Sequence, residues 1–163
     1  MARPRELLLL RHGIAEERGG PTPEVQRALT PAGVRRTQAV VERLVALGLQ
    51  ADELLSSPLL RARQTAEIAV AAGMAGALLL EQALAPGGDP LPLIQASRAE
   101  RLLLVGHEPD LGDLACRLLG APAGAVSLKK AGLAVIRLQP VASLRLLLAP
   151  GVLLAAASAT ARG

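Results

Sequence analysis

The two histidines of this 163-residue chain each follow a short apolar run, and this placement is its clearest chemical signal. His12 follows Leu7–Leu10 and Arg11, and His107 follows Leu102–Val105 and a glycine. Apolar runs of this length predict buried strands, so both imidazoles should lie at strand ends. In an open α/β sheet, ligands bind at the carboxyl ends of the strands. An imidazole beside a guanidinium at that edge can attack phosphorus while the cation holds the phosphate oxygens.

Arg61 is a further candidate, because it follows another predicted strand, Glu53–Ser56. The pair Ser57-Pro58 predicts the start of a helix, with Ser57 as its cap rather than as a catalyst, and the helix should run to about Ala72. Arg61 then lies on the first helical turn. A helix start also offers unpaired backbone N–H groups and the positive end of the helix dipole. Together with the two histidines, these groups predict a pocket for a dianionic phosphoryl group.

Each of these residues also has a plain structural explanation. A histidine after a strand is more often a cap or a surface residue, and a helical arginine such as Arg63 is often simply exposed. We favour a shared site because both histidines of the chain occupy the same kind of position. The chain has a single cysteine, Cys116, so it cannot form an internal disulfide. It lies in an apolar helical pattern typical of a small buried hydrophobe, and we assign it no chemistry.

The elements that must position these groups alternate along the chain. Strand-like apolar runs cover Glu6–Leu10, Glu53–Ser56, Ala77–Leu80, Arg101–Val105, Leu133–Leu138 and Leu144–Ala149. Helical patterns cover the segment from Thr30, a predicted N-cap, to Gly48, the segment from Ser57 to Ala72, Leu91–Ser97 and Asp110–Leu119. This alternation predicts an α/β fold of three layers, with helices on both faces of a mostly parallel sheet of about six strands. The last two strands have no helix between them, which predicts an antiparallel edge.

Composition limits the class of protein. Its length, 51% hydrophobic content and 20% charged content are typical of one globular domain. The chain contains neither a signal-peptide pattern nor the roughly 20 apolar residues of a membrane span, so we expect a cytoplasmic protein without membrane contact. The net charge of +4 comes from dispersed arginines, and Phe, Trp and Tyr are absent, which disfavours nucleic-acid binding. We expect a monomer rather than an oligomer.

Four segments resemble, in order, the motifs of the histidine phosphatase superfamily, whose members have a phosphoglycerate-mutase-like fold. They are Leu10–Gly13, Arg27–Gly33, Ser56–Thr65 and Val105–Pro109. The resemblance covers roughly residues 6–150 and is greatest to the small bacterial phosphohistidine phosphatases of the SixA type. It implies a histidine phosphatase domain over residues 1–150. The Ala-rich residues 151–163 are then expected to form a C-terminal tail or a short helix.

The resemblance also implies a role for each matching residue. His12 would be the nucleophile, and it must be neutral, a state that neighbouring cations favour. Arg11, Arg61 and His107 would hold the equatorial oxygens of the phosphoryl group and stabilise its charge in the transition state. Arg27 matches an arginine of the small members and could touch substrate, although a surface role is equally open. No cofactor and no metal ion are expected.

The chain departs from larger relatives in the segment Glu81–Pro92. Those relatives carry a long insertion there, which builds a lid and supplies a general acid, so the short segment predicts an open site. Neither Glu81 nor Asp89 aligns clearly with that acid. Glu108 is a further candidate for substrate contact or proton donation, although a solvent-facing position before a helix is the simpler interpretation. Phosphohistidine needs little acid, because its imidazole leaving group has a conjugate-acid pKa of about 6.5.

These observations favour a metal-independent phosphatase that acts on a protein phosphohistidine, for instance on a histidine phosphotransfer domain. A broad-specificity phosphomonoesterase of small esters is the main alternative. A mutase is less favoured, since an open site exposes the phosphoenzyme to water. A phosphate-binding module without turnover is disfavoured because all four basic groups are present.

Overall fold

Strand β1 (Glu6–Arg11) lies in the interior of a six-stranded sheet with the order β3-β2-β4-β1-β5-β6. The structure, a computed structural model, describes residues 4–162. The other strands are β2 (Glu53–Ser56), β3 (Leu79–Leu80), β4 (Arg101–Gly106), β5 (Leu133–Arg137) and β6 (Ser143–Leu148). The helices are α1 (Pro31–Ala46), α2 (Leu60–Ala71), α3 (Leu91–Ala96), α4 (Asp110–Leu119) and α5 (Pro150–Thr160), with two short 3-10 turns, η1 (Glu24–Gln26) and η2 (Gln82–Leu84).

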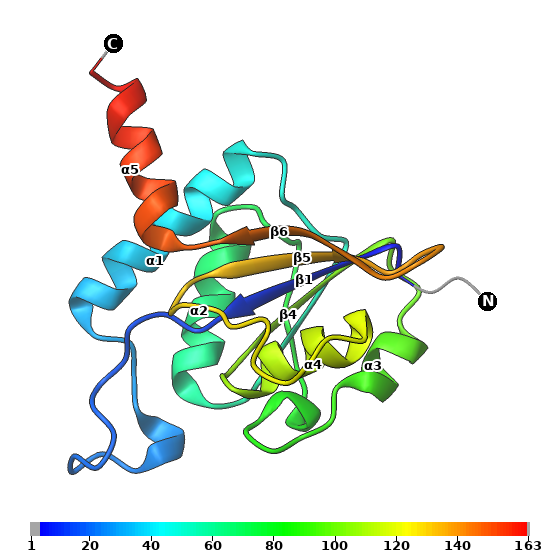
Figure 1. The fold of residues 1–163 in the computed structure, drawn as a ribbon. Coiled ribbons are helices and arrows are strands. Elements are labelled where there is room, and N and C mark those ends of the chain that lie inside the picture. The colour runs from blue at the N-terminus through cyan, green and yellow to red at the C-terminus, as the bar shows by residue number, and fades with distance from the viewer. Residues whose placement is uncertain (1–3, 163) are drawn as a thin grey trace.

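The sheet has the predicted mixed topology. Strands β1, β2, β3 and β4 are mutually parallel, whereas β5 pairs antiparallel with both β1 and β6. The final hairpin therefore forms the antiparallel edge (Figure 1). Strand β3 is shorter than predicted: only Leu79 and Leu80 pair, with Leu55 and Ser56, because β2 ends at Ser56. The α/β fold with three layers is confirmed.

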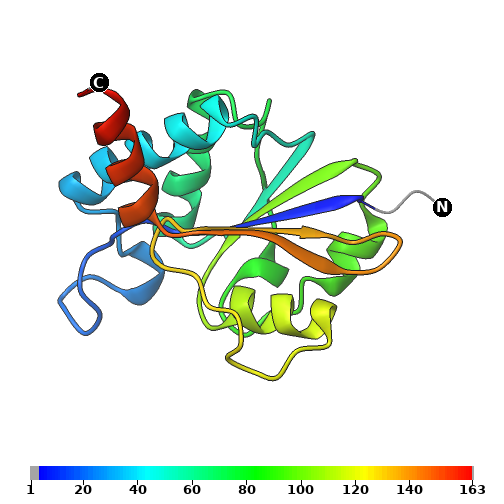
Figure 2. The ribbon, with the colours of Figure 1, turned by 45° about the horizontal axis from the view of Figure 1, so that its top comes forward.

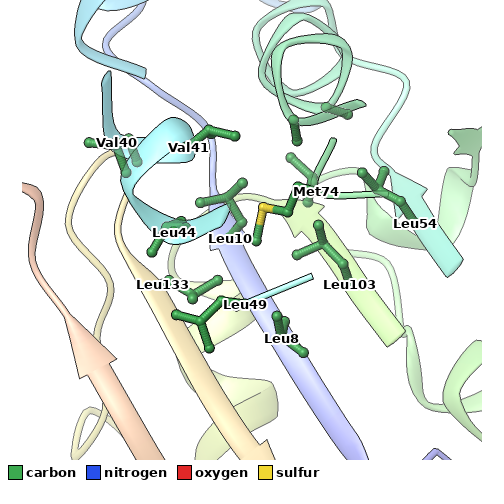
Figure 3. Packing of buried hydrophobic residues seen from close by; sticks show 14 of the residues in the cluster. Leu8, Leu10, Val40, Val41, Leu44, Leu49, Leu54, Met74, Leu103 and Leu133 are labelled. Carbon is green, nitrogen blue, oxygen red and sulfur yellow. The ribbon is translucent and has the colours of Figure 1, made fainter. Parts of the chain in front are cut away.

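Helices cover both faces of the sheet (Figures 1 and 2). The core on the α1, α2 and α5 face contains Leu8 and Leu10 of β1, and the core on the α3 and α4 face contains Leu7 and Leu9. Because successive strand residues point to opposite faces, a strand buried on both sides is a continuous apolar run. The core on the α1 face consists of aliphatic side chains and Met74, shown in Figure 3.

The two helix starts differ from each other. Thr30 caps α1 as predicted: its Oγ1 accepts a hydrogen bond from the Gly33 N–H at 2.9 Å. The prediction that α2 begins at Ser57 with a serine cap was wrong. The backbone stays extended through Leu59, which is the N-cap and makes no side-chain cap bond. The hydroxyl of Ser57 lies instead 2.7 Å from Nε2 of His107, and it accepts the N–H of Leu59, outside the helix.

The C-terminal segment forms helix α5, which lies beside α1. Leu153 is buried against the core of that face, whereas the neighbouring Val152 is 72% exposed. The sequence analysis divided the chain into residues 1–150 and 151–163. Residues 1–3 of the first segment and residue 163 of the second lie outside the described residues. Leu153 thus packs α5 against the core of the domain.

We expect Leu153→Ala to lower the free energy of unfolding by about 2 kcal/mol, because it removes a buried side chain and leaves a cavity. The matched change Val152→Ala, at an exposed site on the same helix, should alter it by less than about 0.5 kcal/mol. Urea denaturation of both variants checks this. Equal effects would show that α5 does not stabilise the domain through Leu153.

Candidate active site

The parallel pairing of β1 with β4 brings the two histidines together. Arg11 is paired with Gly106 at the carboxyl ends of the two strands, so His12 and His107 emerge side by side. Their ring centroids are 5.2 Å apart, with a tilt of 53° between the planes. Residues 95 positions apart in the sequence thus share one edge of the sheet, as predicted.

His12 presents one defined nitrogen. Its Nδ1 is 2.7 Å from the carbonyl oxygen of Gly13, so the neutral ring carries its proton on Nδ1 and donates it to that oxygen. The other nitrogen, Nε2, keeps its lone pair and can act as a nucleophile. The turn needs a glycine, because a Cβ at Gly13 would lie 2.1 Å from the Oγ1 of Thr37.

Burial is the main reason that both histidines are neutral near pH 7. It lowers the pKa of His12 to about 3, and the nearby positive charges act in the same direction. Only the hydrogen bond to Gly13 raises the pKa of His12. The pKa of His107 is lowered to about 4, first by burial and then by Arg61. The nucleophilic lone pair of His12 is therefore available across the neutral pH range.

Arg61 is almost fully buried, with 1% of its surface exposed. Its two terminal nitrogens donate to Glu24, one to the backbone carbonyl and one to carboxylate Oε1, each at 2.9 Å. Burial lowers the pKa of this guanidinium. Arg63, two residues later and about 200° around the helix, is paired with Glu67 on the surface. The helical phase thus separates the buried arginine from the exposed one.

Arg11 and Arg27 complete the basic lining. Arg11 donates from one terminal nitrogen to the carbonyl oxygen of Leu128 at 2.9 Å. Arg27 is 7% exposed, so it is not a surface residue, and it donates to Oε2 of Glu24 at 2.8 Å. Both arginines line the same cavity as the two histidines, of about 790 Å³.

Glu24 was missed by the sequence analysis. Its carboxylate joins Arg61 and Arg27, and Arg18 lies 3.6 Å away. The hydrogen bond from Arg27 is the main cause that lowers the pKa of Glu24, so the carboxylate is charged and balances the buried guanidinium groups. The only signal in the sequence was its position three residues before Arg27.

The three acid candidates lie in different surroundings. Neither Glu81 nor Asp89 is among the described residues that line the cavity, and Asp89 is paired with Arg117 at 3.2 Å. Glu108 does line it, but its Oε1 accepts the Gly112 N–H at 2.8 Å, in the first turn of α4. Burial raises the pKa of Glu108. The short segment after β3 thus brings no carboxylate to the site.

Two negative findings apply to residues 4–162. No group of three or more His, Cys, Asp or Glu side chains is arranged there to hold a metal ion. None of the described helices has the length and apolar character needed to cross a membrane.

We expect Arg61→Gln to weaken the binding of tungstate, a tetrahedral oxyanion, by about 10- to 100-fold. This loss corresponds to one charge-assisted hydrogen bond. Arg63→Gln is the matched control and should leave affinity unchanged, since Arg63 faces solvent. Isothermal titration calorimetry measures both, with circular dichroism to verify the fold. Equal losses in the two variants would place the anion site elsewhere.

Comparison with known proteins identifies the family. The model of the histidine phosphatase superfamily (branch 1) matches residues 7–84. An uncharacterized protein of Picosynechococcus sp. (strain ATCC 27264 / PCC 7002 / PR-6) is 42% identical over 139 residues, covering 81% of this chain and 84% of that protein. A protein assigned as the phosphohistidine phosphatase SixA of Agrobacterium tumefaciens has a TM-score of 0.80 at 25% identity, over 91% of this chain and 99% of its own.

A second solved structure, a protein histidine phosphatase SixA complexed with tungstate, has a TM-score of 0.79 at 20% identity, over 91% of this chain and 99% of its own. This likeness concerns the fold. The family match begins in β1 and extends to η2, and it includes the strand end that carries His12. With the shared fold, it shows that this chain belongs to the histidine phosphatase superfamily, branch 1.

Proposed function

We propose that the protein is a phosphohistidine phosphatase, which removes the phosphoryl group from a histidine of another protein through a phosphorylated His12. One observation carries the proposal. The hydrogen bond from Nδ1 of His12 to the Gly13 carbonyl fixes the tautomer and leaves the Nε2 lone pair among arginines. A neutral nucleophile in a cationic pocket suits attack on a dianionic phosphoryl group.

The reaction takes two displacements at phosphorus. In the first, Nε2 of His12 forms a bond to phosphorus while the bond from phosphorus to the substrate nitrogen breaks. The substrate ring, protonated on its other nitrogen, leaves with that electron pair as neutral imidazole. In the second, water attacks the phosphorylated His12 and gives back the free imidazole and phosphate. Phosphorylation at Nε2 makes the ring of His12 cationic. The Gly13 carbonyl, which accepts the Nδ1 proton, stabilises that charge.

The basic side chains bind the transferred group. Arg11, Arg61 and His107 line the cavity with His12 and would hold the phosphoryl oxygens in both steps. Arg27 is proposed to act through Glu24, which it shares with Arg61, rather than by direct contact with substrate. This chemistry needs neither a metal ion nor an organic cofactor.

The choice of substrate rests on the leaving group. No carboxylate of the segment after β3 lines the cavity, and Glu108 is engaged with the α4 backbone. Because its carboxylate is held by the α4 backbone, we take Glu108 to be poorly placed to protonate an alkoxide, which favours imidazole, a good leaving group. One structural neighbour is described as a phosphohistidine phosphatase and another as a protein histidine phosphatase, and both descriptions agree with this choice.

The proposed partner is a phosphorylated protein. The cavity rim carries charges of both signs, among them Arg18, Glu17 and Lys130, which are exposed and could contact a protein surface. The rival function, hydrolysis of small phosphoesters, has one observation in its favour. Glu108 lines the cavity with a raised pKa, as a general acid would.

Rapid acid-free quench with a labelled phosphodonor should trap a phosphoryl group on His12. The linkage should be acid-labile and alkali-stable, and peptide mass spectrometry should place it on that residue. His12→Ala should remove both the label and turnover, because no other described histidine offers a free nucleophile of this kind. Full activity in His12→Ala would overturn the proposal.

The rate should fall as the pKa of the leaving group rises. We expect kcat/KM to be greatest for a protein phosphohistidine, lower for aryl phosphates and much lower for alkyl phosphates such as phosphoserine. Glu108→Gln and Glu81→Gln should change the aryl and alkyl rates in equal proportion. A flat series, or a selective loss of alkyl hydrolysis in Glu108→Gln, would favour the phosphomonoesterase instead.

A further inference from the structure

Ser57 makes a buried contact with His107 that the phosphoryl chemistry described above does not use. Its Oγ lies 2.7 Å from Nε2 of His107, across 50 positions of sequence. The serine is 0% exposed and the histidine 3% exposed, so water does not compete for this contact. Ser57 does not line the cavity, whereas His107 does. The serine therefore contacts His107 from behind the site.

The proton of this contact can be assigned from the partners of Ser57. Its Oγ already accepts the Leu59 N–H at 3.2 Å, and among residues 4–162 the hydroxyl proton has no acceptor other than Nε2 of His107. The neighbouring Ser56 bonds differently, since its hydroxyl donates to the backbone carbonyl of Ser57 at 3.0 Å. The Ser57 hydroxyl accordingly donates to Nε2, and the neutral ring of His107 must carry its own proton on Nδ1.

We propose that Ser57 is a positioning residue, which fixes His107 in the Nδ1–H tautomer and so makes Nδ1–H the hydrogen-bond donor to the phosphoryl group. Within the described part of the chain, Nδ1 of His107 is buried and has no hydrogen-bond partner. A donor with no protein partner, on a ring that lines the cavity, is available to a ligand.

The two histidines then have the same tautomer but opposite functions. His12 donates a hydrogen bond from Nδ1–H to the Gly13 carbonyl and presents the Nε2 lone pair. His107 accepts a hydrogen bond from the Ser57 hydroxyl at Nε2 and presents Nδ1–H. This difference matters because a second lone pair facing the phosphoryl oxygens would repel them, whereas an N–H attracts them. The catalytic part of this inference rests on the proposed function, but the tautomer does not.

Nuclear magnetic resonance of the ¹⁵N-labelled full chain tests the tautomer directly. The chain has only two histidines, so the spectrum of a His12→Gln variant assigns the signals of His107. At neutral pH, long-range ¹H–¹⁵N correlations should show Nδ1 of His107 as the protonated nitrogen and Nε2 as the acceptor. A protonated Nε2 in the wild-type protein would overturn the proposal, whatever the behaviour of any variant.

Ser57→Ala removes the donor and should let the Nε2–H tautomer of His107 become populated. Tungstate affinity and kcat/KM should both fall by about 10- to 100-fold, as when an orienting partner is lost. The control Ser56→Ala removes an equally buried hydroxyl and should leave the tautomer unchanged. An unchanged tautomer in Ser57→Ala would also refute the inference. The spectrum and the tungstate affinity are measured without turnover. They can therefore support the tautomer inference even if the protein proves not to be a phosphatase.

Discussion

The parallel pairing of β1 with β4 is the interaction on which the site depends. Both strands are buried on both faces, and their leucines fill the two cores at once. A slip of one residue would send each leucine to the opposite face and would separate the ends of the strands. Because the register sets Arg11 opposite Gly106, the residues that follow each strand meet at one point. Core packing thus fixes the distance between the two histidines.

The second constraint is electrostatic. Arg61 is more deeply buried than arginines ordinarily are, and an uncompensated charge there would cost several kcal/mol. Glu24 supplies the compensation from the loop between β1 and α1, and it holds Arg27 with its other oxygen. The same loop therefore joins His12, at its start, to the counter-charge of Arg61 and Arg27. A dianion that enters the cavity meets guanidinium groups that are already oriented.

The positions of site residues that lie at the ends of strands or on helices could be predicted from the sequence. His12 and His107 follow apolar runs that predict buried strands, and the resemblance to the family singled out Arg61 rather than Arg63. Glu24 could not be predicted, because its position depends on how an irregular loop folds back, and no periodic pattern encodes that. Ser57 was misassigned for a related reason: Ser-Pro is a good local signal for a helix start, but the tertiary contact with His107 outweighed it.

The aliphatic core has an optical consequence. With no Phe, Tyr or Trp anywhere in the chain, the protein has almost no absorbance near 280 nm and no intrinsic fluorescence. A single tryptophan introduced on the cavity rim would be the sole fluorophore of the molecule, so its emission would report on that one place without background. The interior shown in Figure 3 contains aliphatic side chains rather than aromatic rings. The protein itself therefore adds no fluorescence to the signal of a probe placed at the site.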